Sequence, residues 1–433
     1  MQRPIWTFFI AITAAIAIPR TVHADACRDL ALAPCPLPMD AAIPDAAAML
    51  QWQGEERVVG LRNTWRMYPG DVFHAGPREA PPLARADHPL ADVPYRHAGH
   101  ERSLADYLAH QRVGGLLLLK DGRVALEYYG LGNTESTLWT SRSVGKSVVS
   151  TLLGIAIREG RIHSIGDPIV RYLPELAGTG WEGVTLRQLL THTSGIAWYE
   201  KYDDPASDFA ALTRCEATAE AYPCIQRLVT SRPRRPGVAP GEVWSYNTGG
   251  AWLAGRVLEQ ATGMSIAAYL ESRLWSRWPM ERDGVWQSLV PGHIDMGGHG
   301  FNATLRDWGR FGLFVERGGR LPDGTALLPE GWIREATTWT HARGSVTPEA
   351  PDGQYGYQWW YNAGETLPGD ADGARSIARE SFWAIGIYGQ FIAIDPVQHV
   401  VMVQWSAWPA ADPEDGTVQE VATFFAAAVR ALR

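Results

Sequence analysis

Ser143 and Lys146 lie three residues apart in a stretch that has the pattern of a helix. Positions i and i+3 share one face of a helix, so the lysine amine can reach the serine hydroxyl. A serine hydroxyl is a weak nucleophile until a base takes its proton, and an uncharged lysine can be that base. The chain has only three lysines, at positions 120, 146 and 201, so a lysine in a motif is unusual here. The alternative is a helix-capping serine beside a solvated lysine, which an otherwise apolar helix fits poorly.

The helix predicted from Ser143 to Glu159 is apolar on most faces, and we expect it to be buried. Unpaired N–H groups and the positive dipole end at a helix start favour negative charge on a reacting oxygen. The same field, together with burial, disfavours a charged lysine and lowers its pKa. This helix therefore predicts a neutral amine beside an activated hydroxyl.

Two other segments complete such a site. A predicted turn at 240–248 presents Tyr246 ahead of a second helix, and a phenol there can pass a proton between nucleophile and leaving group. The alternative is a buried core tyrosine. Segment 384–390 leads into a strand, and its glycines allow a backbone N–H to approach a substrate closely. With the N–H of Ser143 it would form an oxyanion hole, and the alternative is a glycine-bearing sheet edge.

Other reactive patterns are weaker. Ser143 also lies in a near match to G-x-S-x-G that lacks the first glycine and the preceding strand. His192 could serve as a triad base, but a structural histidine beside the cleft is favoured. The sequence has no C-x-x-C or H-E-x-x-H pattern, so neither a metal nor another cofactor is expected.

The elements around these residues predict one sheet. Residues 116–119 and 124–129 flank an Asp-Gly turn, the pattern of a β-hairpin, and residues 390–395 and 400–405 form a second antiparallel pair. A short helix at 103–108 and a closing helix at 418–432 flank these strands, and residues 165–290 are mainly helix and loop. The fold class is α/β of the α+β type: an antiparallel sheet flanked by N- and C-terminal helices, with an inserted, mainly helical region.

Composition and the N-terminal segment bear on location. The net charge is −8 without basic runs, which disfavours nucleic-acid binding. Residues 1–24 have the pattern of a signal peptide, which predicts an exported, periplasmic or secreted protein with no stable membrane span after cleavage; a retained anchor is the alternative. Residues 25–95 are interpreted as an N-terminal extension and residues 96–433 as a catalytic domain. Two local disulfides, Cys27–Cys35 and Cys215–Cys224, are predicted because each closes a short loop.

These motifs, in this order, resemble those of the serine β-lactamase and penicillin-binding protein superfamily: S-x-x-K, then Y-x-N or a variant, then K-T-G or H-x-G on a strand. Tyr246-Asn247-Thr248 with the two glycines that follow, and the sequence GIYGQ at 386–390, are similar to the branch of 6-aminohexanoate-dimer hydrolases and related carboxylesterases. The supporting phrases are VTLRQLLTHTSG (184–195), TGMS (262–265), ATLRD (303–307) and YGYQWW (355–360).

The resemblance implies a β-lactamase/transpeptidase-like fold and a set of roles. Ser143 would be the acylated nucleophile, Lys146 its base and Tyr246 the proton shuttle, with the N–H groups of Ser143 and Ile387 binding the oxyanion. Ala384 stands where the cation of K-T-G or H-x-G would lie, which favours esters or short amides over β-lactams. The residues predicted for the substrate pocket are Trp198, Tyr199, Thr248 (where many relatives have Asn), Gly386 and Tyr388.

Three functions stay open at this point. The favoured one is an exported serine hydrolase that cleaves small carboxylic esters or short amides. The second is a β-lactamase or a D-Ala-D-Ala peptidase. The third is a non-catalytic binding or sensor protein that retains the fold. The sequence does not indicate the oligomeric state.

Overall fold

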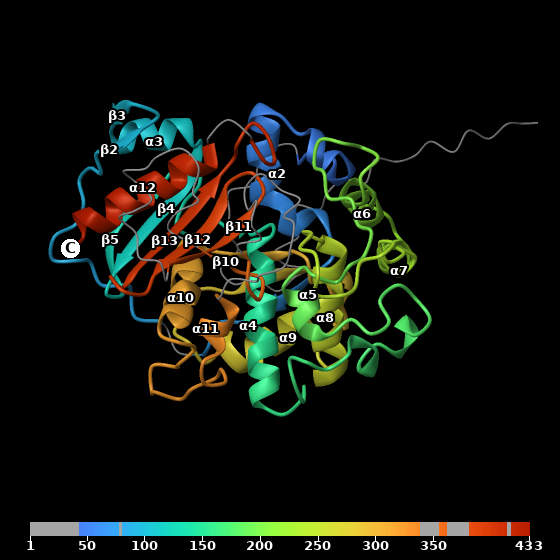
Figure 1. The fold of residues 1–433 in the computed structure, drawn as a ribbon. Helices are drawn as coiled ribbons and strands as arrows, with labels where there is room; N and C mark the ends of the chain where they lie inside the picture. Colours follow the sequence, from blue (N-terminus) through green and yellow to red (C-terminus); the bar gives the residue numbers. More distant parts are fainter. Residues whose placement is uncertain (1–42, 78–79, 338–354, 362–380, 414–416) are drawn as a thin grey trace, which may run out of the picture.

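An antiparallel sheet dominates the computed structural model, which describes residues 43–77, 80–337, 355–361, 381–413 and 417–433 (Figure 1). The order of its strands is β10-β11-β12-β13-β4-β5, so strands from both ends of the chain lie side by side. The predicted hairpin and the predicted C-terminal pair are its β4–β5 and β12–β13 ladders. The bounds are β4 (Val113–Lys120), β5 (Arg123–Tyr129), β10 (Trp360–Tyr361), β11 (Phe382–Gly386), β12 (Gln390–Asp395) and β13 (Val400–Ser406).

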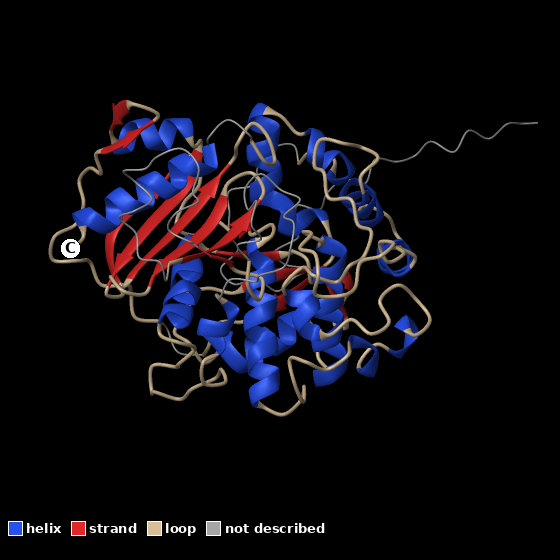
Figure 2. Ribbon diagram, in the orientation of Figure 1, coloured by secondary structure: helices blue, strands red, loops and turns tan. Residues whose placement is uncertain are grey.

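Helices cover both faces of this sheet, as Figure 2 shows. Successive side chains of a strand point to opposite faces. Leu116 and Leu118 accordingly pack with α12 (Thr417–Ala431), which lies across one face beside α3 (Leu104–His110). Leu117 and Leu119 pack on the other face with α10 (Leu305–Glu316) and α4 (Val144–Arg158). The expected antiparallel sheet flanked by terminal helices is confirmed.

Helix α4 runs through the centre of the molecule and carries the predicted nucleophile at its start (Figure 1). Its residues from Val144 to Ala156 are buried, as the apolar pattern predicted. Gly154 lets it approach its neighbour closely, because a Cβ there would lie 2.6 Å from the Trp332 ring. Gly160 adopts a φ of +72° just beyond the helix end. The first turn of α4 is therefore buried, and Ser143 just before it is partly exposed.

A second antiparallel sheet lies in the other half of the molecule, in the order β1-β7-β9-β6 with β8 paired to β7. The expectation of one sheet did not include it. Most of its strands are short, and β1 and β6 lie far from the other three in the sequence, so local periodicity gives little signal. The bounds are β1 (Gly70–Phe73), β6 (Trp139–Thr140), β7 (Gly284–Val290), β8 (Ile294–Asp295) and β9 (Phe301–Ala303), with a separate hairpin of β2 (Tyr95–His97) and β3 (His100–Arg102).

Most of the remaining elements are helices around α4, and region 165–290 is mainly helix and loop until β7 closes it. A disulfide joins Cys215 to Cys224, which confirms that prediction, whereas Cys27 and Cys35 lie outside the described residues. The helices are η1 (Ala46–Gln51), α2 (Gly54–Met67), η2 (Ile169–Arg171), η3 (Pro174–Leu176), α5 (Leu186–Leu190), α6 (Asp208–Glu216), α7 (Ala221–Thr230), α8 (Thr248–Thr262), α9 (Ile266–Leu270), η4 (Glu271–Trp275) and α11 (Trp332–Ala336).

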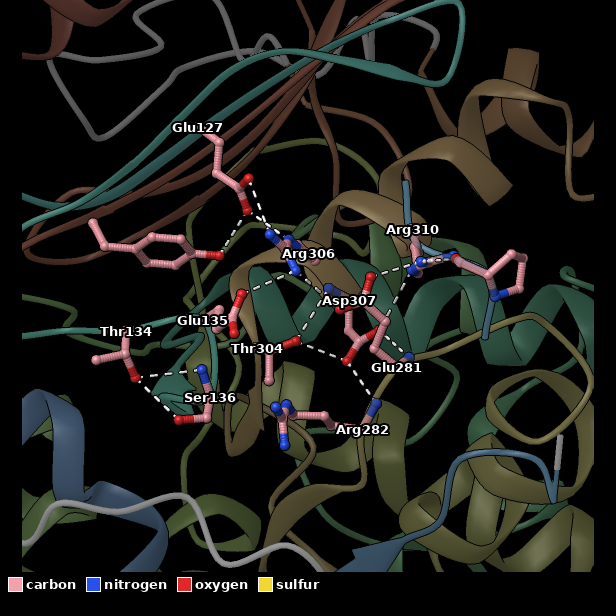
Figure 3. A network of polar contacts seen from close by, with 12 residues as sticks. Glu127, Thr134, Glu135, Ser136, Glu281, Arg282, Thr304, Arg306, Asp307 and Arg310 are labelled. Atoms are coloured by element: carbon pink, nitrogen blue, oxygen red, sulfur yellow. Dashed lines mark hydrogen bonds and ion pairs between the residues drawn. The ribbon is translucent and has the colours of Figure 1, made fainter. Parts of the chain in front are cut away.

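A network of charged side chains joins the sheet to the helical region and to the chain that precedes β2 (Figure 3). Arg306 of α10 makes two hydrogen bonds to Glu127 of β5, at 2.6 and 3.1 Å. Arg310, one turn later, donates to Glu281 at 2.7 Å and to the carbonyl of Pro81 at 2.8 Å. The network therefore fixes three parts of the chain relative to one another.

Nowhere in the described ranges does a helix have both the length and the apolar character needed to span a membrane. Residues 1–24, the predicted signal peptide, lie outside those ranges.

Candidate active site

The side chains of Ser143 and Lys146 meet at the start of α4. The Lys146 amine donates to Ser143 Oγ at 2.8 Å and to the carbonyl of Gly298 at 2.7 Å. Ser143 precedes the helix in a right-handed conformation and makes no side-chain hydrogen bond to cap it. The hydroxyl is therefore not used as a helix cap, in contrast to the structural alternative considered for this serine.

Burial controls the charge of Lys146. The residue is 1% exposed, and desolvation lowers its pKa to about 8 although Glu200 and Glu216 act to raise it. A buried ammonium loses hydration that its neighbours do not fully replace, so the neutral amine is favoured. About a tenth of Lys146 is then unprotonated at pH 7 and able to accept a proton from Ser143.

Tyr246 lies across from this pair. The Lys146 amine is 5.1 Å from the centre of its ring, and Ser143 is close enough to act on the pKa of the phenol. Burial, followed by the negative charge of Glu200, raises the pKa of Tyr246 far above its usual value. The phenol thus stays protonated and can donate or relay a proton without carrying charge itself. The ring is held in a stack with Trp360, with ring centres 5.9 Å apart.

His192 packs behind Tyr246 and does not pair with Ser143. Its ring centre lies 4.4 Å from that of Tyr246 and 4.9 Å from that of Tyr355. Burial, and secondly the charge of Lys146, hold the pKa of His192 well below its ordinary range. Both ring nitrogens are buried without a hydrogen-bond partner among the described residues. This placement fits the structural role favoured for His192 over that of a triad base.

The end of β11 passes directly against the backbone of Ser143. A Cβ at Gly386 would lie 2.6 Å from the Ser141 carbonyl oxygen and 3.0 Å from the Ser143 nitrogen, so only glycine fits. Gly386 pairs with Gln390, which leaves Ile387 in the tight connection between β11 and β12 beside the cavity. An oxyanion hole requires two N–H groups at one cleft, and this arrangement allows those of Ser143 and Ile387 to form one.

A cavity of about 870 Å³ opens in front of Ser143 and Tyr246. Aromatic side chains form much of its wall, and Ile385, Gly386 and Ile387 form the side nearest the nucleophile. Ala384 is fully buried within β11, so the strand offers no cation at that position. Among the other residues of the wall are Arg57, Glu200, Lys201, Tyr202, Asp203, Trp360, Tyr361, Trp383, Phe391, Trp408 and Asp412.

Of the five residues predicted for the pocket, Gly386 and Tyr388 line this cavity, whereas Trp198, Tyr199 and Thr248 are not part of its wall. Trp198 is buried, with its indole N–H directed to Glu200, and the Thr248 hydroxyl is bound to the same carboxylate. Tyr199 is 49% exposed and donates to Asp204. The aromatic loop thus reaches the site through the residue that follows Tyr199.

Glu200 is that residue, and the motifs did not identify it. It lines the cavity, accepts hydrogen bonds from Trp198 and from the backbone and hydroxyl of Thr248, and acts on the charge of both Lys146 and Tyr246. Its position directly after two aromatic residues in a predicted pocket loop was the signal available in the sequence. The Gly298 carbonyl was also missed, and a backbone ligand of this kind leaves no motif.

No three His, Cys, Asp or Glu residues of the described ranges are grouped so that they could hold a metal ion.

Comparisons with known proteins identify relatives of this chain. The family model for β-lactamases matches residues 100–422. The 6-aminohexanoate-dimer hydrolase of Paenarthrobacter ureafaciens is 31% identical over 314 residues, which are 69% of this chain and 73% of that protein. A β-lactamase of Escherichia coli strain K12 is 26% identical over 196 residues, 41% of this chain and 48% of the relative.

Solved structures share the fold. A Bacillus anthracis protein assigned as a 6-aminohexanoate-dimer hydrolase superposes with a TM-score of 0.72 at 22% identity, covering 87% of this chain and 94% of its own. A family VIII carboxylesterase superposes with a TM-score of 0.52 at 18% identity, covering 75% and 94%. The family model spans well over half of the sequence and includes Ser143, Lys146 and Tyr246, whereas Arg57 of the cavity wall lies before it. The chain therefore belongs to the β-lactamase family of serine hydrolases.

Proposed function

We propose that this protein hydrolyses carboxylic esters or short amides through an acyl-enzyme on Ser143. The contact of 2.8 Å between the amine of Lys146 and the hydroxyl of Ser143, beside a cavity, is the observation that carries the proposal. The lysine pKa of about 8 makes that contact usable, because the amine is then available as a base. The names of the 31% identical hydrolase and of the carboxylesterase with the same fold support an ester or amide substrate.

The reaction begins with proton transfer from Ser143 Oγ to neutral Lys146 while the oxygen attacks the substrate carbonyl. The N–H groups of Ser143 and Ile387 bind the oxyanion that forms. The carbon–oxygen or carbon–nitrogen bond of the leaving group then breaks, and Tyr246 gives it a proton that is replaced from Lys146. Water attacks the acyl-enzyme in the second half, with the same groups carrying its proton, and releases the acid and free Ser143.

The alternative activity is that of a β-lactamase or D-Ala-D-Ala peptidase. The buried Ala384 and the apolar strand around it argue against it, because no cation lies there to hold a substrate carboxylate. A non-catalytic role is disfavoured by the Ser143–Lys146 contact, because a binding protein has no need of a partly deprotonated lysine at a serine.

Intact mass after short exposure to a mixed library of esters, amides and β-lactams tests these alternatives. We expect an ester or amide acyl group on Ser143 and none on Ser143→Ala. Retention of a penicillin adduct, together with nitrocefin turnover, would favour the β-lactam function instead. A chain that is labelled by neither the library nor a fluorophosphonate would be catalytically inert.

We also infer that the chain is exported. The disulfide between Cys215 and Cys224 supports an oxidising compartment, where such bonds persist. The mass of the mature protein from an exporting host tests this inference, since cleavage after Ala24 removes residues 1–24. A full-length chain retained in the cytoplasm with reduced thiols would contradict it.

A further inference from the structure

A buried polar group near Lys146 lies outside the wall of the cavity. Glu216, at the end of α6, accepts from His299 Nε2 at 3.1 Å and from Gln287 Nε2 at 3.0 Å. All three side chains are at most 4% exposed. The proposed mechanism does not use them. Isolation from water is costly for a charged carboxylate, so a buried pair of this kind is expected to serve a structural or functional role.

His299 directly follows Gly298 in the chain, and this position gives the buried pair a purpose. Gly298 is the residue whose carbonyl accepts the second hydrogen bond of Lys146, at 2.7 Å. The His299 backbone packs on the first turn of α4, where a Cβ at Gly145 would lie 3.2 Å from the His299 Cα. The carbonyl of Gly300 accepts from the Gln287 backbone at 2.8 Å. The segment that presents the Gly298 carbonyl is thus held from α4, from β7 and, through His299, from Glu216.

Glu216 is itself held in place by a covalent link. It directly follows Cys215, whose disulfide to Cys224 joins the last turn of α6 to the first turn of α7. The Cα atoms of the two cysteines are 5.5 Å apart. A series of buried contacts therefore links the disulfide to the Lys146 amine. It passes through Glu216, His299 and the Gly298 carbonyl.

We propose that Glu216 and His299 are positioning residues for Lys146: they fix the Gly298 carbonyl that holds the amine against Ser143, and the Glu216 carboxylate sets its electrostatic surroundings. This inference rests on the proposed function, since it presupposes that Lys146 is the base. It assigns a role to two side chains that neither touch the substrate nor contact Ser143.

The charged and titratable groups around Lys146 come from the segment after α5, the end of α6 and the segment before α8. Glu200 follows α5 and Glu216 ends α6, and both raise the pKa of Lys146 against the larger effect of burial. His192, next to α5, stays neutral, and Tyr246, before α8, stays protonated. Burial opposes ionisation of Glu216, but His299, Gln287 and Arg142 together hold its pKa below the usual value, so it keeps its charge.

The test is the pH profile of kcat/KM for Glu216→Gln, which keeps the shape of the side chain and removes its charge. Loss of a negative charge near the ammonium favours the neutral amine, so the midpoint of the acid limb should move down by about 0.5–1 pH unit. Glu420→Gln is the matched control, because Glu420 is a buried carboxylate of α12 bound to Tyr95 and Gln111 on the far side of the sheet. Its midpoint should not move.

His299→Gln tests the positioning half of the proposal. It should lower kcat about tenfold with little change in KM, because a misplaced base slows the chemical step more than it weakens binding. It also serves if Glu216→Gln does not fold. An unchanged midpoint in folded Glu216→Gln, or full kcat in folded His299→Gln, would overturn the inference and leave the pair a structural one.

Acylation separates this failure from that of the proposed function. Wild-type protein that forms an ester-derived adduct on Ser143 but gives unshifted profiles in the variants contradicts only the positioning role. Wild-type protein that forms no adduct at all contradicts the proposed function, and the positioning role falls with it.

Discussion

The network around the partly buried Arg306 and the site around the fully buried Lys146 are both polar, but they treat their cations in opposite ways. Arg306 meets Glu127 in two hydrogen bonds and also lies 3.2 Å from Glu135. Lys146 has a serine hydroxyl and a backbone carbonyl as its hydrogen-bond partners, and its nearest negative charges act from a distance. The pKa of Arg306 is raised, and that of Lys146 is lowered to about 8. Full pairing fixes structure, whereas incomplete pairing of a buried cation makes a reactive amine.

The variant with the largest expected effect on activity removes the base and leaves the Arg306 network intact. Lys146→Met should lower kcat/KM by about 10³-fold, because general-base catalysis contributes on that scale. Its Tm should stay the same or rise, since the variant removes a desolvated amine. Lys120→Met is the control, because Lys120 pairs with Asp121 at the surface, and it should keep its activity within about twofold. Ester turnover and thermal denaturation measure both.

The converse variant, Arg306→Met, breaks the network. The Glu127 side chain is buried and would keep the Tyr129 hydroxyl at 2.9 Å, but Arg85 at 3.2 Å would be its remaining cation, so we expect a loss of about 2–3 kcal/mol in the free energy of unfolding. Its kcat/KM at 25 °C should be unchanged. Arg123→Met removes an exposed pair with Asp87 and should cost at most about 0.5 kcal/mol. Equal destabilisation by the two variants in urea would contradict the contrast.

The pH dependence sharpens the comparison without a mutation. Only neutral Lys146 can act as base, and its pKa is about 8, so kcat/KM should rise with pH through that value. Below the midpoint the rate should fall about tenfold for each pH unit, as expected for one group. A pH-stat assay with an uncharged ester follows this limb. A rate that is flat between about pH 6 and 9 would mean that the lysine is not the base.

The smallest expected effect concerns a third buried group, Glu259 of α8, which has a single cationic partner. Burial raises its pKa to about 7, and Arg256 offsets this only in part. A raised acid pKa gives stability that is full below the unfolded pKa of about 4.5 and is lost as pH rises through about 7.

Wild-type Tm should therefore fall between pH 6 and 8, with about 1–2 kcal/mol of stability lost. Glu259→Gln should show a smaller fall, because it has no proton to lose there. A variant with the same pH dependence as the wild type would assign the effect to Asp295, a neighbouring carboxyl whose pKa burial also raises.

Local patterns predicted much of the fold and the centre of the site. An apolar pattern that continues over several residues is enough to identify a helix or strand. Such patterns mark the helix after Ser143, the hairpin around Asp121-Gly122 and the strands near the C-terminus, and the structure contains all of them. The contact between Ser143 and Lys146 follows from helical spacing alone.

What escaped prediction depends on the tertiary arrangement. Strand β1 pairs with β7, which lies far along the chain, and the sequence of neither strand indicates that the two are paired. Trp198 was assigned to the pocket by its loop and Thr248 by its place in the Y-x-N motif, but their polar atoms turn to Glu200. Glu200, Glu216 and the Gly298 carbonyl act through space, and no spacing rule connects them to Lys146.

The segment before residue 100 affects how this protein should be produced. The family match begins at residue 100, yet β1 pairs with β7, the Tyr388 hydroxyl donates to Met49, and Arg57 donates to Trp408. A clone trimmed to the matched boundary would expose the edge of β7 and an apolar surface, which favours aggregation. Expression trials should therefore start upstream of η1, and sequence surveys that cut relatives at the family boundary will discard part of the wall around the nucleophile.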